Sequence, residues 1–163
     1  MNIFNQLLDK LEQTQILNKC IYNNKTAMAV GLPSVNKANL ILEIYEQFRD
    51  KLILVLTSDE QSAQALCSDF NCFAGNMVAE VFPYRDLVLR PIESSSNEYE
   101  IERMGVLFRI LNKKTRVVFC SVVSACLYTM PQHILEKSVI KLESGQHFSQ
   151  SELIGKIADI GYV

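Results

Sequence analysis

The residues of this chain best placed for chemistry follow a short apolar run near the amino terminus. Ala27–Val30 leads into Gly31, a short loop, Lys37 and then an apolar helical pattern. This is the spacing of a phosphate-binding loop, G-x-x-x-x-G-K-[ST], in which backbone N–H groups and the lysine hold phosphate and the hydroxyl holds Mg²⁺. The pattern raises the hypothesis of a nucleotide site at residues 31–38.

The details of this loop argue against nucleotide chemistry. Asn36 stands where the motif has its second glycine, and Ala38 stands where it has the Mg²⁺-binding hydroxyl. Pro33 also removes one backbone donor from the cradle. We therefore expect neither a bound cofactor nor hydrolysis here. The degenerate loop comprises Gly31, Ser34, Asn36, Lys37 and Ala38.

A second candidate, Asp59-Glu60, follows the apolar run at residues 51–56. One interpretation is the acidic pair of an NTPase, which holds Mg²⁺ and activates water. The alternative is a helix start, because Ser58 and Gln61 form a capping box and two carboxylates in a first turn suit the helix dipole. We favour the capping role, so we expect no catalytic residue.

Composition excludes several function classes. The net charge of −2 and a pI near 5.7 give no general attraction to nucleic acid, and the basic stretch 113–116 is typical of a helix end and turn. Two histidines and five cysteines without a C-x-x-C pair predict no metal site and reduced thiols. Apolar runs fall short of the roughly 18 residues that cross a bilayer. We expect a cytoplasmic protein without a membrane partner.

Short apolar runs alternate with helical patterns through most of the chain, which predicts right-handed βαβ units and a parallel sheet flanked by helices. The character changes after Pro131, where residues 138–142 alternate like a strand with one exposed face. We predict an α/β domain over residues 1–136 and the truncated start of a small α+β domain over residues 137–163. The predicted parallel strands are 27–30, 51–56, 77–82 and 116–120.

Several motifs, in one order, resemble the N-terminal, UvrB-like region of bacterial transcription-repair coupling factors. Gly31, Leu32 and Ala38 are similar to the family's G-L-x-G-S-x-x-A version of the phosphate loop. Further matches to the family's motifs are Phe82–Asp86, Pro91, Ser94, Glu98 and Arg103, then Val117–Pro131 with Ser121, Ser124 and Leu127, then Leu142–Gln146, Leu153 and Gly161-Tyr162.

The resemblance implies a RecA-like fold that keeps the shape of UvrB for recognition by the repair protein UvrA. Residues 83–92 are too short and too poor in aromatics for the DNA-clamping hairpin of UvrB. In the family, ATP, Mg²⁺, DNA and RNA polymerase are engaged by parts that would lie beyond residue 163. Arg85, Arg90 and Arg103 are candidates for contact with UvrA or with other domains of the same polypeptide.

Two other functions stay open at this point. The chain could belong to a working phosphate-loop ATPase of the UvrB type, or it could be an unrelated stand-alone α/β protein that binds a phosphate ligand. Binding of ATP and Mg²⁺ would separate these functions from a silent module.

Overall fold

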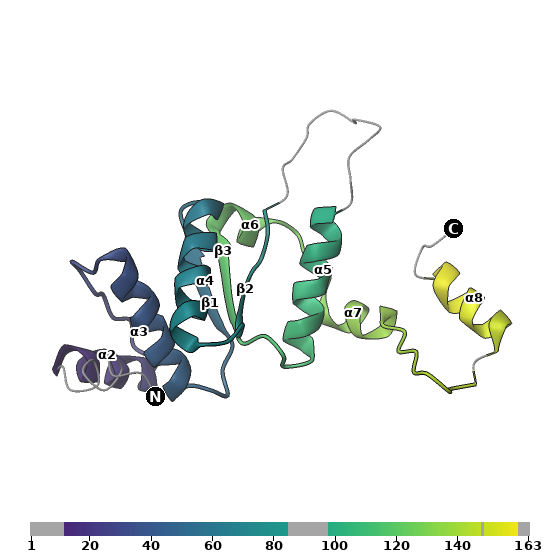
Figure 1. Cartoon of the computed structure of the whole chain (residues 1–163), viewed down its shortest axis with the longest axis horizontal. Helices are drawn as coiled ribbons and strands as arrows, with labels where there is room; N and C mark the ends of the chain where they lie inside the picture. The colour runs from purple at the N-terminus through teal and green to yellow at the C-terminus, as the bar shows by residue number, and fades with distance from the viewer. Residues whose placement is uncertain (1–11, 85–97, 148, 160–163) are drawn as a thin grey trace, which may run out of the picture. The chain divides into compact units, whose positions relative to one another are not determined.

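The computed structural model describes residues 12–84, 98–147 and 149–159. Helices and short strands alternate from residue 34 to residue 126, and helices alone follow among the described residues (Figure 1). In chain order, the elements are α2 (Glu12–Tyr22), α3 (Ser34–Gln47), β1 (Ile53–Thr57), α4 (Glu60–Ala74), β2 (Ala79–Val81), α5 (Glu98–Leu111), β3 (Val117–Ser121), α6 (Val122–Cys126), α7 (Gln132–Ser138) and α8 (Gln150–Asp159).

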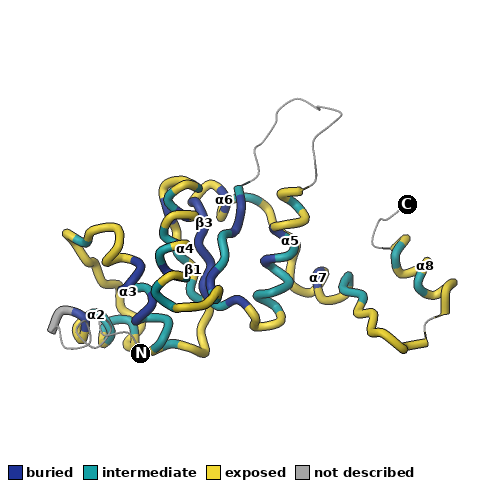
Figure 2. Tube along the Cα trace, in the orientation of Figure 1, coloured by how far each residue is buried: buried dark blue, intermediate teal, exposed yellow. Residues whose placement is uncertain are grey.

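The sheet has three parallel strands in the order β1-β3-β2. Val117 of β3 lies opposite both Ile53 of β1 and Ala79 of β2. All five residues of β3 are buried, as expected for the central strand of a sheet covered on both faces (Figure 2). The predicted α/β class with a parallel sheet is confirmed, and three of the four predicted strands are present.

Helices cover the sheet on both faces because successive side chains of a strand point in opposite directions. On one face, Val117 and Phe119 pack with Phe70 of α4 and Leu42 of α3. On the other face, a second cluster joins Val118 and Cys120 to Phe82 and to Val106 of α5. The phenyl ring of Phe70 lies 5.8 Å from that of Phe119, at the centre of the first cluster.

The segment Ala27–Val30 is not a strand, and this prediction was wrong. Its residues are exposed and have no assigned secondary structure. Two of the four residues are alanines, whose small side chains add little to the cross-strand packing that stabilises a sheet. Helix α3 still docks through Ala38 and Leu42, so its packing does not depend on pairing of the segment before it.

Residues at both ends of α4 explain where this helix begins and ends. The carboxylate of Asp59 accepts a hydrogen bond from the Ser62 N–H at 2.7 Å, so Asp59, not the predicted Ser58, is the N-cap. The prediction that Asp59 belongs to a helix start is confirmed, but the N-cap lies one residue later than predicted. At the other end, Gly75 adopts φ of 72°, the left-handed conformation that glycine tolerates best, and ends the helix as predicted.

The side chain of Asn71 fixes β2 to α4. Its carbonyl oxygen accepts the N–H groups of Val78 and Ala79 at 3.1 and 3.0 Å, and its amide donates to the Ala79 carbonyl at 2.9 Å. The amide therefore bonds strand β2 much as a neighbouring strand would. This contact helps a strand of only three residues to keep its place.

The chain divides into two compact units, residues 1–127 and 128–163. The second unit has helices α7 and α8, and in its described part the predicted strand at 138–142 is absent: Ser138 ends α7 and the next four residues are irregular. A strand with one wet face needs a neighbouring strand, and this unit offers none among its described residues. The predicted domain boundary after residue 136 stays a prediction.

Candidate functional site

The loop predicted from the phosphate-binding pattern lies before α3 and is open to solvent. Gly31 has φ of 79°, and a Cβ added to it would meet no described atom within 4 Å. Pro33 is the N-cap of α3 and forms no side-chain hydrogen bond there. The side chains of Ser34, Asn36 and Lys37 are exposed. The structure thus keeps these residues together at one helix start, and the segment before them is not a strand of the sheet.

Ala38 differs from the rest of the loop because it belongs to the core. It is 0% exposed and packs in the cluster of Leu42, Phe70 and Phe119. This is the position at which a phosphate-binding loop places its Mg²⁺-binding hydroxyl. A hydroxyl here would enter an apolar cluster, where burial of a polar group without a partner is costly.

The N-terminus of α4, which follows β1, is a second place near the sheet where an anion could bind. The Asp59 carboxylate occupies it, accepting from the Ser62 N–H and also from the Ser58 and Ser62 hydroxyls at 2.6 and 2.9 Å. These hydrogen bonds, with that from Ser58 the largest cause, lower the pKa of Asp59 below its ordinary value. An ionised carboxylate at this position repels phosphate and is itself engaged in capping.

Arg103 lies in the interior, near the carboxyl ends of β2 and β3. It is 7% exposed, and its guanidinium donates to the Pro83 carbonyl at 2.7 Å and to the Ser124 hydroxyl at 2.9 Å. The same group stacks on the ring of Phe82 at 4.0 Å, a cation–π contact. Arg103 therefore joins three separate parts of the chain: α5, the segment after β2 and the short helix α6.

Ser124 is the partner that sequence reasoning did not assign to a site. It is fully buried, and its hydroxyl also lies 2.8 Å from the Pro83 carbonyl, to which it can donate. In the sequence it is distinguished only as one of the residues that match the family motif. The two other candidate arginines, Arg85 and Arg90, lie outside the described residues.

Glu80 and Arg109 form the ion pair that ties β2 to α5. The guanidinium of Arg109 approaches the Glu80 carboxylate at 2.5 to 2.8 Å, and the Thr115 hydroxyl donates to the same carboxylate. Both charged side chains are partly exposed, so the pair is a structural clamp of modest strength.

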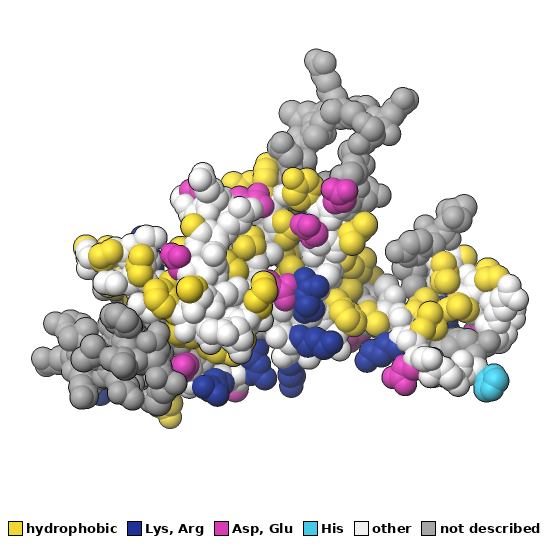
Figure 3. Space-filling model, viewed as in Figure 1, with side chains coloured by type: hydrophobic (Ala, Val, Ile, Leu, Met, Phe, Trp, Pro, Cys, Tyr) yellow, Lys and Arg dark blue, Asp and Glu magenta, His cyan; other side chains and the backbone are white. Residues whose placement is uncertain are grey.

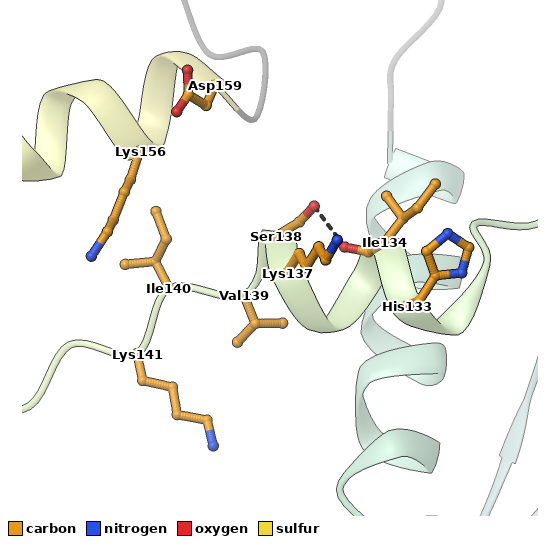
Figure 4. A pocket seen from close by; sticks show the side chains of 9 residues that line it. All are labelled: His133, Ile134, Lys137, Ser138, Val139, Ile140, Lys141, Lys156 and Asp159. Carbon is orange, nitrogen blue, oxygen red and sulfur yellow. Dashed lines mark hydrogen bonds between the residues drawn. The ribbon is translucent and has the colours of Figure 1, made fainter.

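A hollow of about 650 Å³ in the second unit is lined by α7, α8 and residues 139–141. Lys137, Lys141 and Lys156 border it, but their ammonium groups lie on different sides and do not converge (Figure 4). Lys156 is engaged with Glu152 at 2.7 Å, and Asp159 adds negative charge to the lining. The arrangement does not have the converging donors that hold an anion.

Other kinds of site are absent from the part of the chain that the structure describes. It contains no cluster of three or more His, Cys, Asp or Glu side chains able to hold a metal ion. Within the same ranges, every helix is too short or too polar to cross a membrane. On the face drawn in Figure 3, most basic side chains lie toward the lower edge, where acidic and apolar side chains also lie.

Comparison with known proteins gives a distant similarity. The chain is 20% identical over 113 residues to the transcription-repair-coupling factor of Bacillus subtilis (strain 168). The matched stretch covers 69% of this chain and 10% of that protein, so the chain corresponds to a small part of its relative. No family model and no solved structure matches the chain. The similarity relates this chain, distantly, to a region of a transcription-repair coupling factor.

Proposed function

We propose that this chain is a catalytically silent RecA-like module, related to the UvrB-like N-terminal region of transcription-repair coupling factors. Two lines of support are the distant similarity to the Bacillus protein and the three-stranded parallel sheet with helices on both faces. The module acts as a shape that other proteins recognise, in the cytoplasm, and its parent protein couples transcription to nucleotide excision repair.

The observation that carries the proposal is the burial of Ala38. The position that would supply the Mg²⁺-binding hydroxyl is used for core packing, while Lys37 beside it is exposed. A lysine alone on a helix start is not a nucleotide site, because phosphate transfer needs a metal ion and a group that orients water. The loop and helix are retained because α3 completes the core.

UvrA is the partner that the resemblance implies. By this resemblance, residues 137–163 would be the beginning of the domain that UvrA recognises, and Arg85 and Arg90 remain candidate contacts in the first domain. Replacement of both arginines by alanine should weaken UvrA binding at least about tenfold if they bind carboxylates of UvrA. Arg49→Ala, at an exposed arginine outside this stretch, is the matched control.

Titration of the unaltered chain with ATP–Mg²⁺ tests the silent-module proposal, and micromolar binding would overturn it. Restoring the motif tests why the loop is silent. The double variant Asn36→Gly, Ala38→Ser recreates the glycine and the hydroxyl of a phosphate-binding loop. We expect no saturable binding of ATP–Mg²⁺ by calorimetry, because the segment before the loop is unpaired and Pro33 still blocks one donor. Micromolar binding by this variant would mean that two substitutions alone silenced a working nucleotide site.

A further inference from the structure

Basic residues gather at the amino ends of two neighbouring strands. Residues 50–52 precede β1 and residues 113–116 precede β3, and these strands pair with Ile53 opposite Val117. The two segments hold four of the 16 lysines and arginines of the chain but one of its 18 acidic residues. A chain with a net charge of −2 thus concentrates positive charge at one place. The basic cluster consists of Lys51, Lys113, Lys114 and Arg116, and the acidic residue is Asp50.

Hydrogen bonds of the backbone hold the two segments next to each other. The Ile53 N–H donates to the Arg116 carbonyl at 2.8 Å, and the Arg116 guanidinium donates to the Arg49 carbonyl. Within the segments, the N–H groups of Lys51 and Lys113 each donate to a backbone carbonyl three residues earlier, both at 2.9 Å. The fold therefore fixes the backbone from which these charged side chains extend.

Local negative charge does not balance the basic cluster. α3 and α5 end shortly before the two segments, and the carboxyl end of a helix carries roughly half a negative charge. The Asp50 carboxylate lies 3.5 Å from the Lys51 ammonium group, and both side chains are well exposed. Two helix ends and one carboxylate offset about two of the four positive charges. The remaining charge is complementary to a negatively charged partner.

The basic cluster borders a hollow of about 230 Å³ that also has apolar walls. Leu52, which precedes β1, is 52% exposed and offers its aliphatic side chain to a partner. Burial of such a side chain stabilises a complex, and the surrounding cations can bind carboxylates. The lining side chains that matter here are Lys51, Lys113, Arg116, Asp50, Leu52 and Ile110.

The apolar walls distinguish between two kinds of anionic partner. A nucleic-acid strand is held by a basic groove that follows its backbone and by aromatic side chains on which its bases stack. Among the described residues, aromatic side chains do not line the hollow. An acidic protein segment brings carboxylates for the cations and an apolar side chain for Leu52 and Ile110.

We propose that the basic cluster is a docking surface for an acidic protein segment with an apolar side chain between its carboxylates. The carboxylates bind Lys51, Lys113 and Arg116, and the apolar side chain contacts Leu52. Exposed charges mainly set the rate and specificity of association, so we expect weak, salt-dependent binding. Docking here requires neither a nucleotide site nor UvrA, so its failure and the failure of the proposed function are separate results.

Fluorescence anisotropy of this chain with a labelled peptide tests the proposal. The probe is a synthetic peptide with one leucine between three glutamates on each side. We expect saturable binding with a Kd of about 100 μM or lower in about 50 mM salt. In about 300 mM salt the binding should weaken about tenfold or more, because salt screens exposed charges.

Charge reversal locates the binding surface. Lys51→Glu, Lys113→Glu should weaken peptide binding at least about tenfold, and the milder Lys51→Gln, Lys113→Gln about threefold or more. Lys19→Glu, Lys25→Glu is the matched control, because it changes the net charge equally at exposed lysines outside the basic cluster, and it should weaken binding less than about threefold. Circular dichroism should show that all three variants keep the fold, since the substituted side chains are exposed.

The apolar contact is tested with a second peptide, in which serine replaces the leucine. Leu52→Ser should weaken binding of the leucine peptide about fivefold and leave binding of the serine peptide nearly unchanged. Equal losses for the two peptides would contradict a contact between Leu52 and the apolar side chain.

Four further results would overturn the proposal. The first is no saturable binding of the leucine peptide at low salt. The second is an equal loss in the two charge-reversal variants, which would mean that net charge alone attracts the peptide. The third is tighter binding of an oligothymidylate of the same length, which would assign the basic cluster to nucleic acid. The fourth is competition by inorganic triphosphate at a lower concentration than by unlabelled peptide, which would assign the hollow to a small anion.

Discussion

Replacing Arg103 by methionine should destabilise the protein by about 4 kcal/mol. Methionine keeps an apolar stem in place of the arginine side chain and removes the guanidinium. The two short hydrogen bonds, to the Pro83 carbonyl and to the Ser124 hydroxyl, have a charged donor, and each contributes at least about 1.5 kcal/mol. The contact of the guanidinium with the Phe82 ring adds about 1 kcal/mol.

The assay is urea unfolding followed by circular dichroism, with the free energy of unfolding extrapolated to water. A double-mutant cycle with Ser124→Ala isolates the contact between the two side chains, and we expect a coupling energy of about 1 kcal/mol or more. Arg49→Met is the matched control: this arginine is exposed, so the variant should stay within about 0.5 kcal/mol of the unaltered chain. A loss below about 1 kcal/mol for Arg103→Met, at an unchanged denaturant slope, would refute the structural role assigned to Arg103.

Three further predictions concern the interior. Asn71→Ala should cost about 2–3 kcal/mol in urea unfolding because the backbone groups of β2 lose their partner, and Asn71→Asp, which keeps an acceptor, should cost less; equal losses would contradict this. Burial, with a smaller contribution from a nearby carboxylate, raises the pKa of Cys67 from 9.0 to about 11, so its contribution to stability is complete below pH 9 and is lost as the pH rises to 11. The free energy of unfolding should therefore fall less steeply over this range in Cys67→Ala, and parallel profiles would refute the assignment. A disulfide reagent at neutral pH should modify the exposed Cys72 and Cys126 rapidly and the buried Cys67 and Cys120 only after unfolding, as mass spectrometry of the labelled peptides can establish.

Much of the α/β body is predictable from local sequence. The run at residues 51–56 is apolar throughout after its first residue, and β1 is found at Ile53–Thr57. The pattern is typical of strands covered on both faces, but Leu54 and Leu56 of β1 are exposed. Gly75 follows a helical pattern and ends α4 in the left-handed conformation. These signals depend on a few neighbouring residues, so the sequence alone carries them.

The features that local sequence did not predict depend on contacts between elements that are distant in the chain. Ala27–Val30 is as apolar as a buried strand, but pairing depends on whether a neighbouring edge is occupied, which no local pattern records. The contacts of Asn71 and Arg103 likewise depend on the relative position of elements distant in the chain. A buried arginine that bonds to a carbonyl cannot be told from a surface arginine by its residue type.

The sequence shows which residues of the candidate loop depart from the phosphate-binding motif. It does not show which of them are buried or what they contact. The substitution of Ala38 for a hydroxyl residue is visible in the sequence, and the structure adds that this methyl group belongs to the core. The exposure of Lys37 and the unpaired segment before it could not be read from spacing. The distant similarity to a region of a coupling factor is one of the two supports of the proposed function.

The proposed function requires that this chain neither binds nor hydrolyses nucleotides. Calorimetric titration of the unaltered chain with ATP in the presence of Mg²⁺, combined with a phosphate-release assay, tests it most directly. We expect no saturable heat and no phosphate release above the buffer rate. Saturable binding in the micromolar range, or turnover that Lys37→Ala abolishes, would contradict the claim.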